Sequence, residues 1–140
     1  MHELRLRLSR SAFAIVRLPP DAPLPDGFAL DRPWHSATRT RAELSLIAPT
    51  RALPAALPPE ARVEEPYRAF EVAGPLDFSL VGILAELTAA LADARIPVFV
   101  VSTFDTDTLF VREERVEEAW RTLRAAGHAL EREEDLSESG

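Results

Sequence analysis

The sequence predicts an α+β protein made of two related units, and three observations lead to this fold class. The C-terminal half reads in the order strand, helix, strand, strand, helix, strand. The N-terminal half contains further strand-like segments separated by Pro-rich stretches. Short motifs recur in the two halves in the same order, which indicates a duplicated unit.

The N-terminal half begins with two strand-like segments. Residues 3–9 alternate between charged side chains and leucine, and residues 12–18 are mainly apolar, so both predict strands. Residues 19–27 are too rich in proline for a helix and predict an extended loop. A hairpin over residues 33–49 and a loop or broken helix over residues 50–66 complete this half.

The C-terminal half starts with a strand over residues 67–74, which ends at the turn signal Gly74-Pro75. A helix is expected within residues 76–94. Its apolar stripe consists of leucines spaced four, three and four residues apart, namely Leu80, Leu84, Leu87 and Leu91.

Two strands and a second helix come next. Residues 95–104 are apolar and β-branched, which predicts a strand buried on both faces or nearly so. Residues 106–113 predict the next strand, after a short polar turn. The second helix is expected over residues 113–126, with glutamates in its first turn, arginines in its last and Gly127 after its end. A short strand over residues 128–133 comes last.

The internal repeat rests on two pairs of short motifs. "VRLPPD" (16–21) parallels "VAGPLD" (72–77), and "SATRTRAELSLIAP" (36–49) parallels "VSTFDTDTLFVRE" (101–113). The first copy is degenerate, because prolines replace most of its helix. We therefore expect a degenerate unit at residues 1–64, a complete unit at 65–132, and an acidic flexible tail at 133–140.

The composition excludes several classes of function. The chain has no Cys, and all of its 16 basic residues are Arg, which excludes thiolate metal sites and lysine Schiff-base chemistry. A net charge of −7 argues against a nucleic-acid partner. No apolar run is long enough to span a membrane, and the first ten residues do not resemble a secretory signal, so a cytoplasmic protein is expected.

The sequence also offers no catalytic or metal-binding constellation. His2, His35 and His128 are scattered without the spacing of metal ligands. The carboxylates are numerous, but none is paired with a placed base. We expect neither enzyme activity nor a metal or other cofactor.

Residues 74–128 resemble the ACT domain. Gly82-Ile83-Leu84-Ala85-Glu86 matches the helix-start motif of that family, and Ile96 and the strand at 98–104 match the segment after its first helix. The resemblance extends to small bacterial proteins with two tandem ACT units, which are related to the regulatory domains of aspartate kinase. The CASTOR arginine sensors of animals look like larger relatives. The first unit departs from the pattern because it lacks the Gly-initiated helix.

This resemblance implies tandem ferredoxin-like βαββαβ units, with antiparallel sheets and helices on one face. It also implies a binding module without chemistry of its own. ACT domains typically bind an amino acid or a similar small ligand where two units meet, often across a dimer. The turn before the first helix, the start of that helix and the adjoining hairpin contact the ligand. The candidate site residues are therefore Asp77, Phe78, Ser79, Leu80, Val81, Gly82, Ile83, Ser102, Thr103, Asp105, Thr106 and Asp107.

Elementary chemistry fits these positions. Unpaired N–H groups at a helix start suit an α-carboxylate, and we expect them to belong to residues 80–83. Asp107 is the first candidate for an ammonium group and Asp105 the second. A purely structural role is the alternative at each position: Gly82 allows close helix packing, Asp77 or Ser79 caps the helix, and the hairpin aspartates bond their own turn.

Two functions remain open at this point. The first is a regulatory protein that binds a small ligand, forms a homodimer and acts on a partner protein. The second is a structural or interaction module that pairs through its sheet edges without a free ligand. A cavity beside Gly82 and a carboxylate of Asp107 without an internal partner such as Arg would favour the first function.

Overall fold

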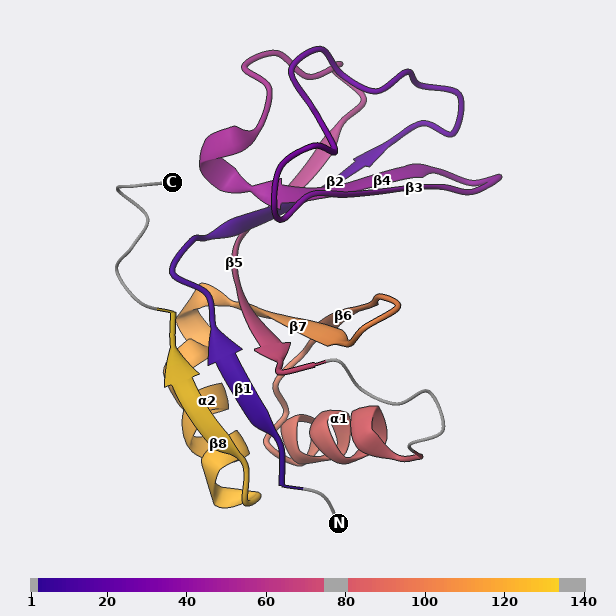
Figure 1. The fold of residues 1–140 in the computed structure, drawn as a ribbon. Helices are drawn as coiled ribbons and strands as arrows, with labels where there is room; N and C mark the ends of the chain where they lie inside the picture. Colours follow the sequence, from indigo (N-terminus) through magenta and orange to yellow (C-terminus); the bar gives the residue numbers. More distant parts are fainter. Residues whose placement is uncertain (1–2, 75–80, 134–140) are drawn as a thin grey trace. The chain divides into compact units, whose positions relative to one another are not determined.

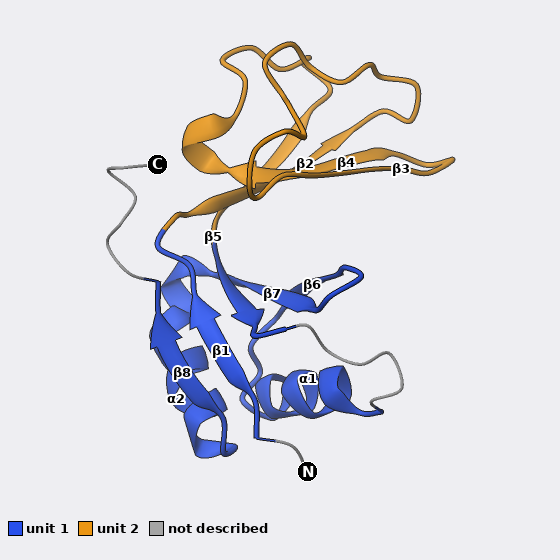
Figure 2. Cartoon of the chain, in the orientation of Figure 1, with its two compact units in different colours: residues 1–10, 68–140 blue, residues 11–67 orange. Residues whose placement is uncertain are grey.

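The computed structural model describes residues 3–74 and 81–133, which divide into two compact units (Figures 1 and 2). Unit 1 consists of residues 1–10 and 68–140, and unit 2 of residues 11–67. Strand β5 (Arg62–Val72) runs from unit 2 into unit 1. The other elements of unit 1 are β1 (Arg5–Leu8), α1 (Ile83–Asp93), β6 (Phe99–Ser102), β7 (Asp107–Arg112), the 3-10 helix η2 (Glu113–Arg115), α2 (Val116–Ala125) and β8 (Ala129–Arg132).

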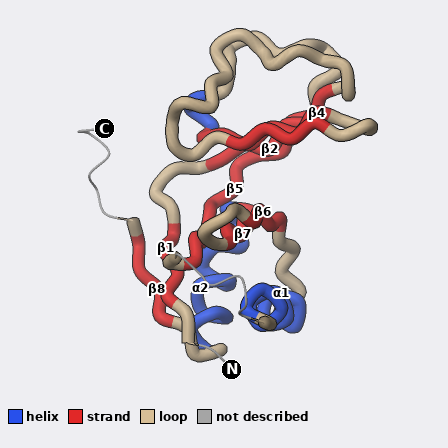
Figure 3. Tube along the Cα trace, turned by 45° about the vertical axis from the view of Figure 1, so that its right-hand side comes forward, coloured by secondary structure: helices blue, strands red, loops and turns tan. Residues whose placement is uncertain are grey.

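The sheet of unit 1 has the order β6-β7-β5-β1-β8. The first strand of the chain is therefore central, between β5 and β8. It runs antiparallel to β5, with Leu6 opposite Val72, and parallel to β8, with Leu6 opposite Leu130. Strands β6 and β8 form the two opposite edges of this sheet (Figures 1 and 3).

Both helices of unit 1 cover the same face of its sheet. Leu6, Phe70 and Leu109 from the strands share one buried cluster with Leu87 of α1 and Leu123 of α2. Each of these five side chains is fully buried. Every second residue of β1 is a buried leucine, and each helix has an apolar stripe. Each element therefore has one apolar side to bury, and these sides pack together between the sheet and the helices.

The predicted order of strands and helices in the C-terminal half is confirmed, as are the helices on one face. The burial expected for residues 95–104 is wrong. Strand β6 covers only residues 99–102 and lies at the edge of the sheet, and Phe99 is 38% exposed. A β-branched apolar run fits a half-covered edge as well as a buried centre, because its composition does not specify its neighbours.

Unit 2 contains β2 (Phe13–Leu18), β3 (Ser36–Arg39), β4 (Leu44–Pro49) and the 3-10 helix η1 (Thr50–Ala52). With β5 its sheet has the order β3-β4-β2-β5, and these strands are antiparallel. No α-helix occurs in residues 11–67. Instead, loop residues such as Phe28, Leu53 and Leu57 pack on the buried side chains of the sheet. The predicted loss of the helix in the first unit is confirmed.

The two units are interleaved along the chain. The polypeptide leaves unit 1 after Arg10 and returns to it at Arg68. Ser9 N–H donates to Ala69 O at 2.7 Å, Ala69 N–H donates to Ser9 Oγ at 3.0 Å, and the Arg68 guanidinium donates to Ser9 O. The two crossing segments are thus joined within unit 1. Strand β1 pairs with β5 and β8 within unit 1, whereas the sequence suggested a division at residues 64 and 65.

Candidate functional site

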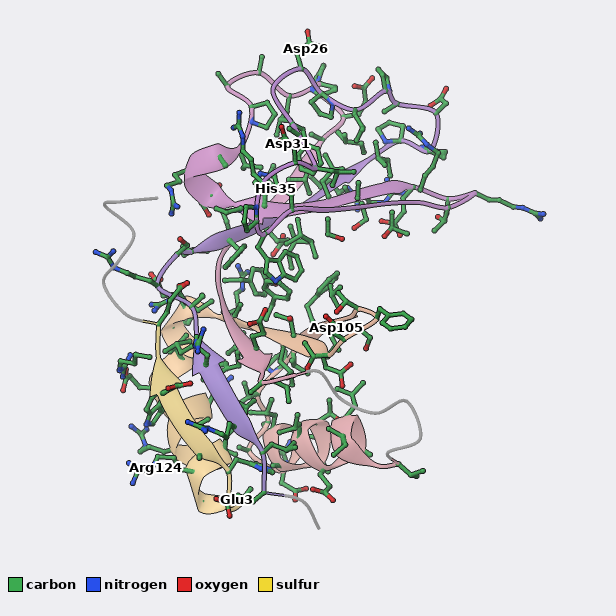
Figure 4. All side chains as sticks on the ribbon, viewed as in Figure 1. Glu3, Asp26, Asp31, His35, Asp105 and Arg124 are labelled. Atoms are coloured by element: carbon green, nitrogen blue, oxygen red, sulfur yellow. The ribbon has the colours of Figure 1, made fainter. Side chains whose placement is uncertain are left out.

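The polar segment between β6 and β7 is a tight hairpin. Ser102 lies opposite Asp107, and Thr103 N–H donates to Thr106 O at 2.8 Å, so the tip consists of Phe104 and Asp105. The Thr103 hydroxyl also donates to Thr106 O at 3.1 Å. The five predicted hairpin residues are therefore brought together by local pairing. Figure 4 shows Asp105 beside this hairpin.

Asp107 lies on the face of the sheet that carries the helices. Side chains alternate between faces along a strand, and Leu109 and Val111 of the same strand belong to the buried cluster under the helices. Asp107 is half-buried, and its Oδ1 accepts a hydrogen bond of 2.6 Å from Ser102 Oγ. A hydroxyl donor satisfies one carboxylate oxygen but does not neutralise its charge.

The charges near this carboxylate in the sequence are negative. Residues 96–111 contain Asp105 and Asp107 and no arginine, and residues 81–93 contain Glu86 and Asp93 and no arginine. Arg68, Arg115 and Arg132 of unit 1 form ion pairs with glutamates outside the hairpin, such as Arg115 with Glu118 at 2.8 Å. The hairpin therefore favours a ligand group that carries a positive charge.

Helix α1 starts on the same face of the sheet. Its first residue, Ile83, is buried in the cluster that includes Leu109 and Val111. Gly82 is the N-cap, with φ of 84° and no side-chain cap, and Glu86 N–H donates to Gly82 O at 2.9 Å. The N–H groups of residues 83–85 precede the first intrahelical bond and point out of the helix end.

This geometry changes part of the interpretation drawn from the sequence. The helix begins at Ile83, so Val81 and Gly82 precede it. Of the donors expected at residues 80–83, Ile83 lies in the first turn, and residues 84 and 85 join it there. Within the described part of the chain, no atom beyond its chain neighbours lies within 4 Å of the place where a Cβ of Gly82 would be, so close packing against these residues does not explain this glycine. The left-handed backbone at Gly82 explains why glycine is found there, because glycine adopts a positive φ without strain. Asp77, Phe78, Ser79 and Leu80 lie outside the described residues.

Gly74 has a role that sequence reasoning missed. A Cβ on Gly74 would lie 3.0 Å from Asp105 O and 3.1 Å from Thr106 Cβ. The Thr106 hydroxyl donates to Val72 O at 2.7 Å. Gly74 therefore allows the hairpin tip to pack on the end of β5. The sequence showed only a turn signal here, because the approach of a distant segment has no local pattern.

The two histidines that the structure describes, His35 and His128, do not belong to a metal site. His35 is hydrogen-bonded to Arg32 O at 3.1 Å, and His128 Nδ1 accepts the N–H of Leu4 at 3.2 Å. In the described ranges, no group of three or more His, Cys, Asp or Glu side chains could hold a metal ion. No helix among the described residues is long and apolar enough to cross a membrane.

Comparison with known proteins gives a consistent result. The ACT domain family model matches residues 62–125. Protein Atu0741 from Agobacterium tumefaciens shares 30% sequence identity with this chain, with a TM-score of 0.84 and 96% of each chain covered. No curated protein matches the chain.

Two more distant structures share the fold alone. The Vibrio cholerae protein VC0802, described as a possible transport protein, is 18% identical, with a TM-score of 0.70 over 89% of this chain and 91% of its own. The regulatory subunit of aspartate kinase from Thermus flavus is 15% identical, with a TM-score of 0.60 over 86% of this chain and 95% of its own.

Proposed function

The chain belongs to the ACT domain family, and we propose that it is a regulatory protein that binds a small ligand, an amino acid, without catalysing a reaction. One observation carries this proposal. The half-buried carboxylate of Asp107 faces the helix layer, accepts a hydrogen bond from a neutral hydroxyl, and shares that layer with the uncapped start of α1.

An amino acid fits the chemistry of these two elements. Its ammonium group is a donor for the carboxylate of Asp107, and its α-carboxylate is an acceptor for the N–H groups at residues 83–85. Among the described residues, no atom beyond the chain neighbours of Gly82 lies within 4 Å of the place of its Cβ, so none of these atoms obstructs a ligand there. The proposed site consists of Val81, Gly82 and Ile83 with Ser102, Thr103, Asp105, Thr106 and Asp107, and residues 77–80 are proposed to complete it.

Ligand binding can change the conformation of such a protein and so regulate what it contacts. A ligand that binds one arrangement of the site more tightly than another shifts the population towards that arrangement. We propose that the protein acts in the cytoplasm as a homodimer and that ligand binding changes what a regulated partner protein contacts. Neither a cofactor nor a metal is part of this proposal.

The alternative function is an interaction module that pairs through its sheet edges and has no free ligand. An ion pair between Asp107 and an arginine of the same chain would favour this alternative. Asp107 instead accepts a hydrogen bond from the neutral hydroxyl of Ser102, so its charge is left for an external group. This favours ligand binding as the first proposal.

A thermal-shift screen of the twenty amino acids tests the proposal. A ligand at 100 times its Kd stabilises a protein by about 2.7 kcal/mol, which raises the Tm by several degrees for a chain of this size. We expect stabilisation of the wild type and a much smaller shift for Asp107→Asn. Asp26→Asn is the matched control, because Asp26 is exposed in unit 2. An unchanged Tm with every amino acid would contradict the proposal.

A further inference from the structure

The start of β1 is held by a side chain in place of a backbone carbonyl. Ala129 N–H donates to Leu4 O at 2.8 Å, which is a bond of the parallel ladder between β1 and β8. The even spacing of such a ladder would direct the N–H of Leu4 to the carbonyl of Gly127. Gly127 follows α2 with φ of 101°, and the N–H of Leu4 donates to His128 Nδ1 at 3.2 Å instead. The ring of His128 thus replaces a backbone acceptor.

This hydrogen bond requires a neutral ring. A backbone N–H can donate to Nδ1 only if this nitrogen carries a lone pair, so the proton of the ring lies on Nε2. An imidazolium donates at both nitrogens and accepts at neither. The side chains of His128 and Leu4 are 6% and 8% exposed, so water has little access to the bond. Protonation therefore removes the acceptor of the Leu4 N–H and places two donors against each other.

The charges on the elements around the ring balance one another. The start of the first strand carries Glu3 and Arg5, the last turn of α2 carries Arg124, and β8 carries Glu131. All four side chains are exposed, and Figure 4 shows Glu3 and Arg124 at the same end of unit 1. Two of them are acidic and two are basic, so together they give an imidazolium no net attraction. Within the described ranges, no carboxylate forms an ion pair with His128.

The C-terminal end of α2 gives a cation little support. The last carbonyls of a helix attract positive charge, but here the following backbone occupies them. His128 N–H donates to Leu123 O at 3.2 Å, and Gly127 N–H donates to Arg124 O at 3.0 Å. These bonds weaken the attraction of the helix end for the ring, so the hydrogen bond from Leu4 dominates.

We propose that His128 forms a pH-sensitive contact that holds the start of β1 at neutral pH and releases it in acid. An imidazole in water takes up a proton near pH 6.5, and in the unfolded chain no hydrogen bond from Leu4 opposes this. Unfolding therefore takes up a proton, so the contact stabilises the fold above about pH 6.5 and is lost as the pH falls. Because β1 lies between β5 and β8, its release weakens unit 1. This inference is independent of the proposed ligand.

His128→Asn separates the titration from the hydrogen bond, because an asparagine Oδ1 accepts an N–H but gains no proton. Urea unfolding measures the unfolding constant at each pH. Between about pH 7.5 and 5.5, we expect this constant to rise up to about tenfold more for wild type than for His128→Asn. His35→Asn is the matched control, because His35 is the other described histidine and binds Arg32 O; it should follow wild type. Equal rises for wild type and His128→Asn would overturn the inference.

Two measurements on wild type test the same contact without a variant. Nitrogen-15 NMR of the imidazole should show Nδ1 of His128 without a proton at neutral pH. Amide hydrogen exchange should show that the protection factor of the Leu4 N–H falls when the pH is lowered to about 5.5, since its acceptor is lost. A proton on Nδ1 at neutral pH, or a Leu4 protection factor that does not change in acid, would contradict the proposal even if His128→Asn failed to fold.

Discussion

Gly74 shows how a single residue without a side chain positions the candidate site. Asp105 O and Thr106 Cβ lie 3.0 and 3.1 Å from the place where a Cβ of residue 74 would lie, which is a tight contact. Because the Thr106 hydroxyl also binds Val72 O, the hairpin tip is held on the end of β5 by one contact and one hydrogen bond. A Cβ at residue 74 therefore requires the tip to shift by a few tenths of an ångström.

We expect Gly74→Ala to destabilise the protein by about 1 kcal/mol, the low end of the usual cost of an added methyl group, because Gly74 is exposed. The free energy of unfolding from urea denaturation measures this effect. Ala73→Ser is the control, because Ala73 is the exposed neighbour of Gly74. Equal unfolding free energies for Gly74→Ala and wild type would show that the hairpin tip does not pack on residue 74.

His128 stabilises the fold through a buried hydrogen bond. Its Nδ1 accepts the N–H of Leu4, and its side chain is 6% exposed. We expect His128→Ala to destabilise the protein by about 1–3 kcal/mol, because the N–H of Leu4 is left buried without an acceptor. His35→Ala removes a more exposed hydrogen bond and serves as the control. Equal unfolding free energies for these two variants would contradict a structural role for His128.

At the scale of elements, the local sequence patterns predict whether a segment is a helix or a strand better than they predict where it begins and ends. The strands and helices of the C-terminal half follow from period and turn chemistry, so their order could be predicted from the sequence. The start of α1 could not, because the apolar stripe continues backwards through Leu80 whereas the helix begins after Gly82, whose φ is 84°. The edge position of β6 depends on which strands pair, and that is a tertiary property.

The candidate site, too, could be predicted from the sequence only in part. Ser102 and Asp107 form a pair because the hairpin between them is local, so their proximity follows from the turn. Asp107 shares a face with Leu109 and Val111 because the three residues alternate along one strand. The polar turn by itself could not show that Ser102 lies opposite Asp107, because the number of residues in the tip decides this register.

Arg115 links the end of one helix to the start of the other. Its Nη1 donates to Arg95 O at 3.2 Å, just after α1, and its Nη2 lies 2.8 Å from Glu118 in α2. We expect Arg115→Ala to destabilise the protein by about 1 kcal/mol, because a partly exposed charged donor is lost. Arg121→Ala on the exposed side of α2 is the control. Denaturant midpoints that agree for the two variants would contradict this link.

At the scale of the whole molecule, the first strand of the chain completes the core of unit 1. Strand β1 lies between β5 and β8, and Leu6 and Leu8 are almost fully buried. A sequential division of the chain would leave β8 without its neighbour, because β8 pairs with β1 and not with β5. The sequence predicts β1 as a strand, but long-range pairing decides which unit receives it.

We expect Leu6→Ala to destabilise the protein by about 2–5 kcal/mol, the usual range for a buried leucine. Leu30→Ala is the control, since Leu30 is 59% exposed, and surface changes usually remain within about 0.5 kcal/mol. Thermal and urea unfolding measure both effects. A Leu6→Ala variant as stable as Leu30→Ala would mean that the N-terminal segment is dispensable for the fold.

The central claim is that the carboxylate of Asp107 and the start of α1 bind an amino acid. Calorimetric titration of the amino acid that most stabilises the wild type, into wild type, Asp107→Asn and Asp26→Asn, tests it most directly. We predict that Asp107→Asn weakens binding by about tenfold or more, since a charge-assisted hydrogen bond contributes about 1.5–3 kcal/mol. Asp26→Asn is expected to bind like wild type. Equal affinities for wild type and Asp107→Asn, or no binding of any amino acid to the wild type, would contradict the claim.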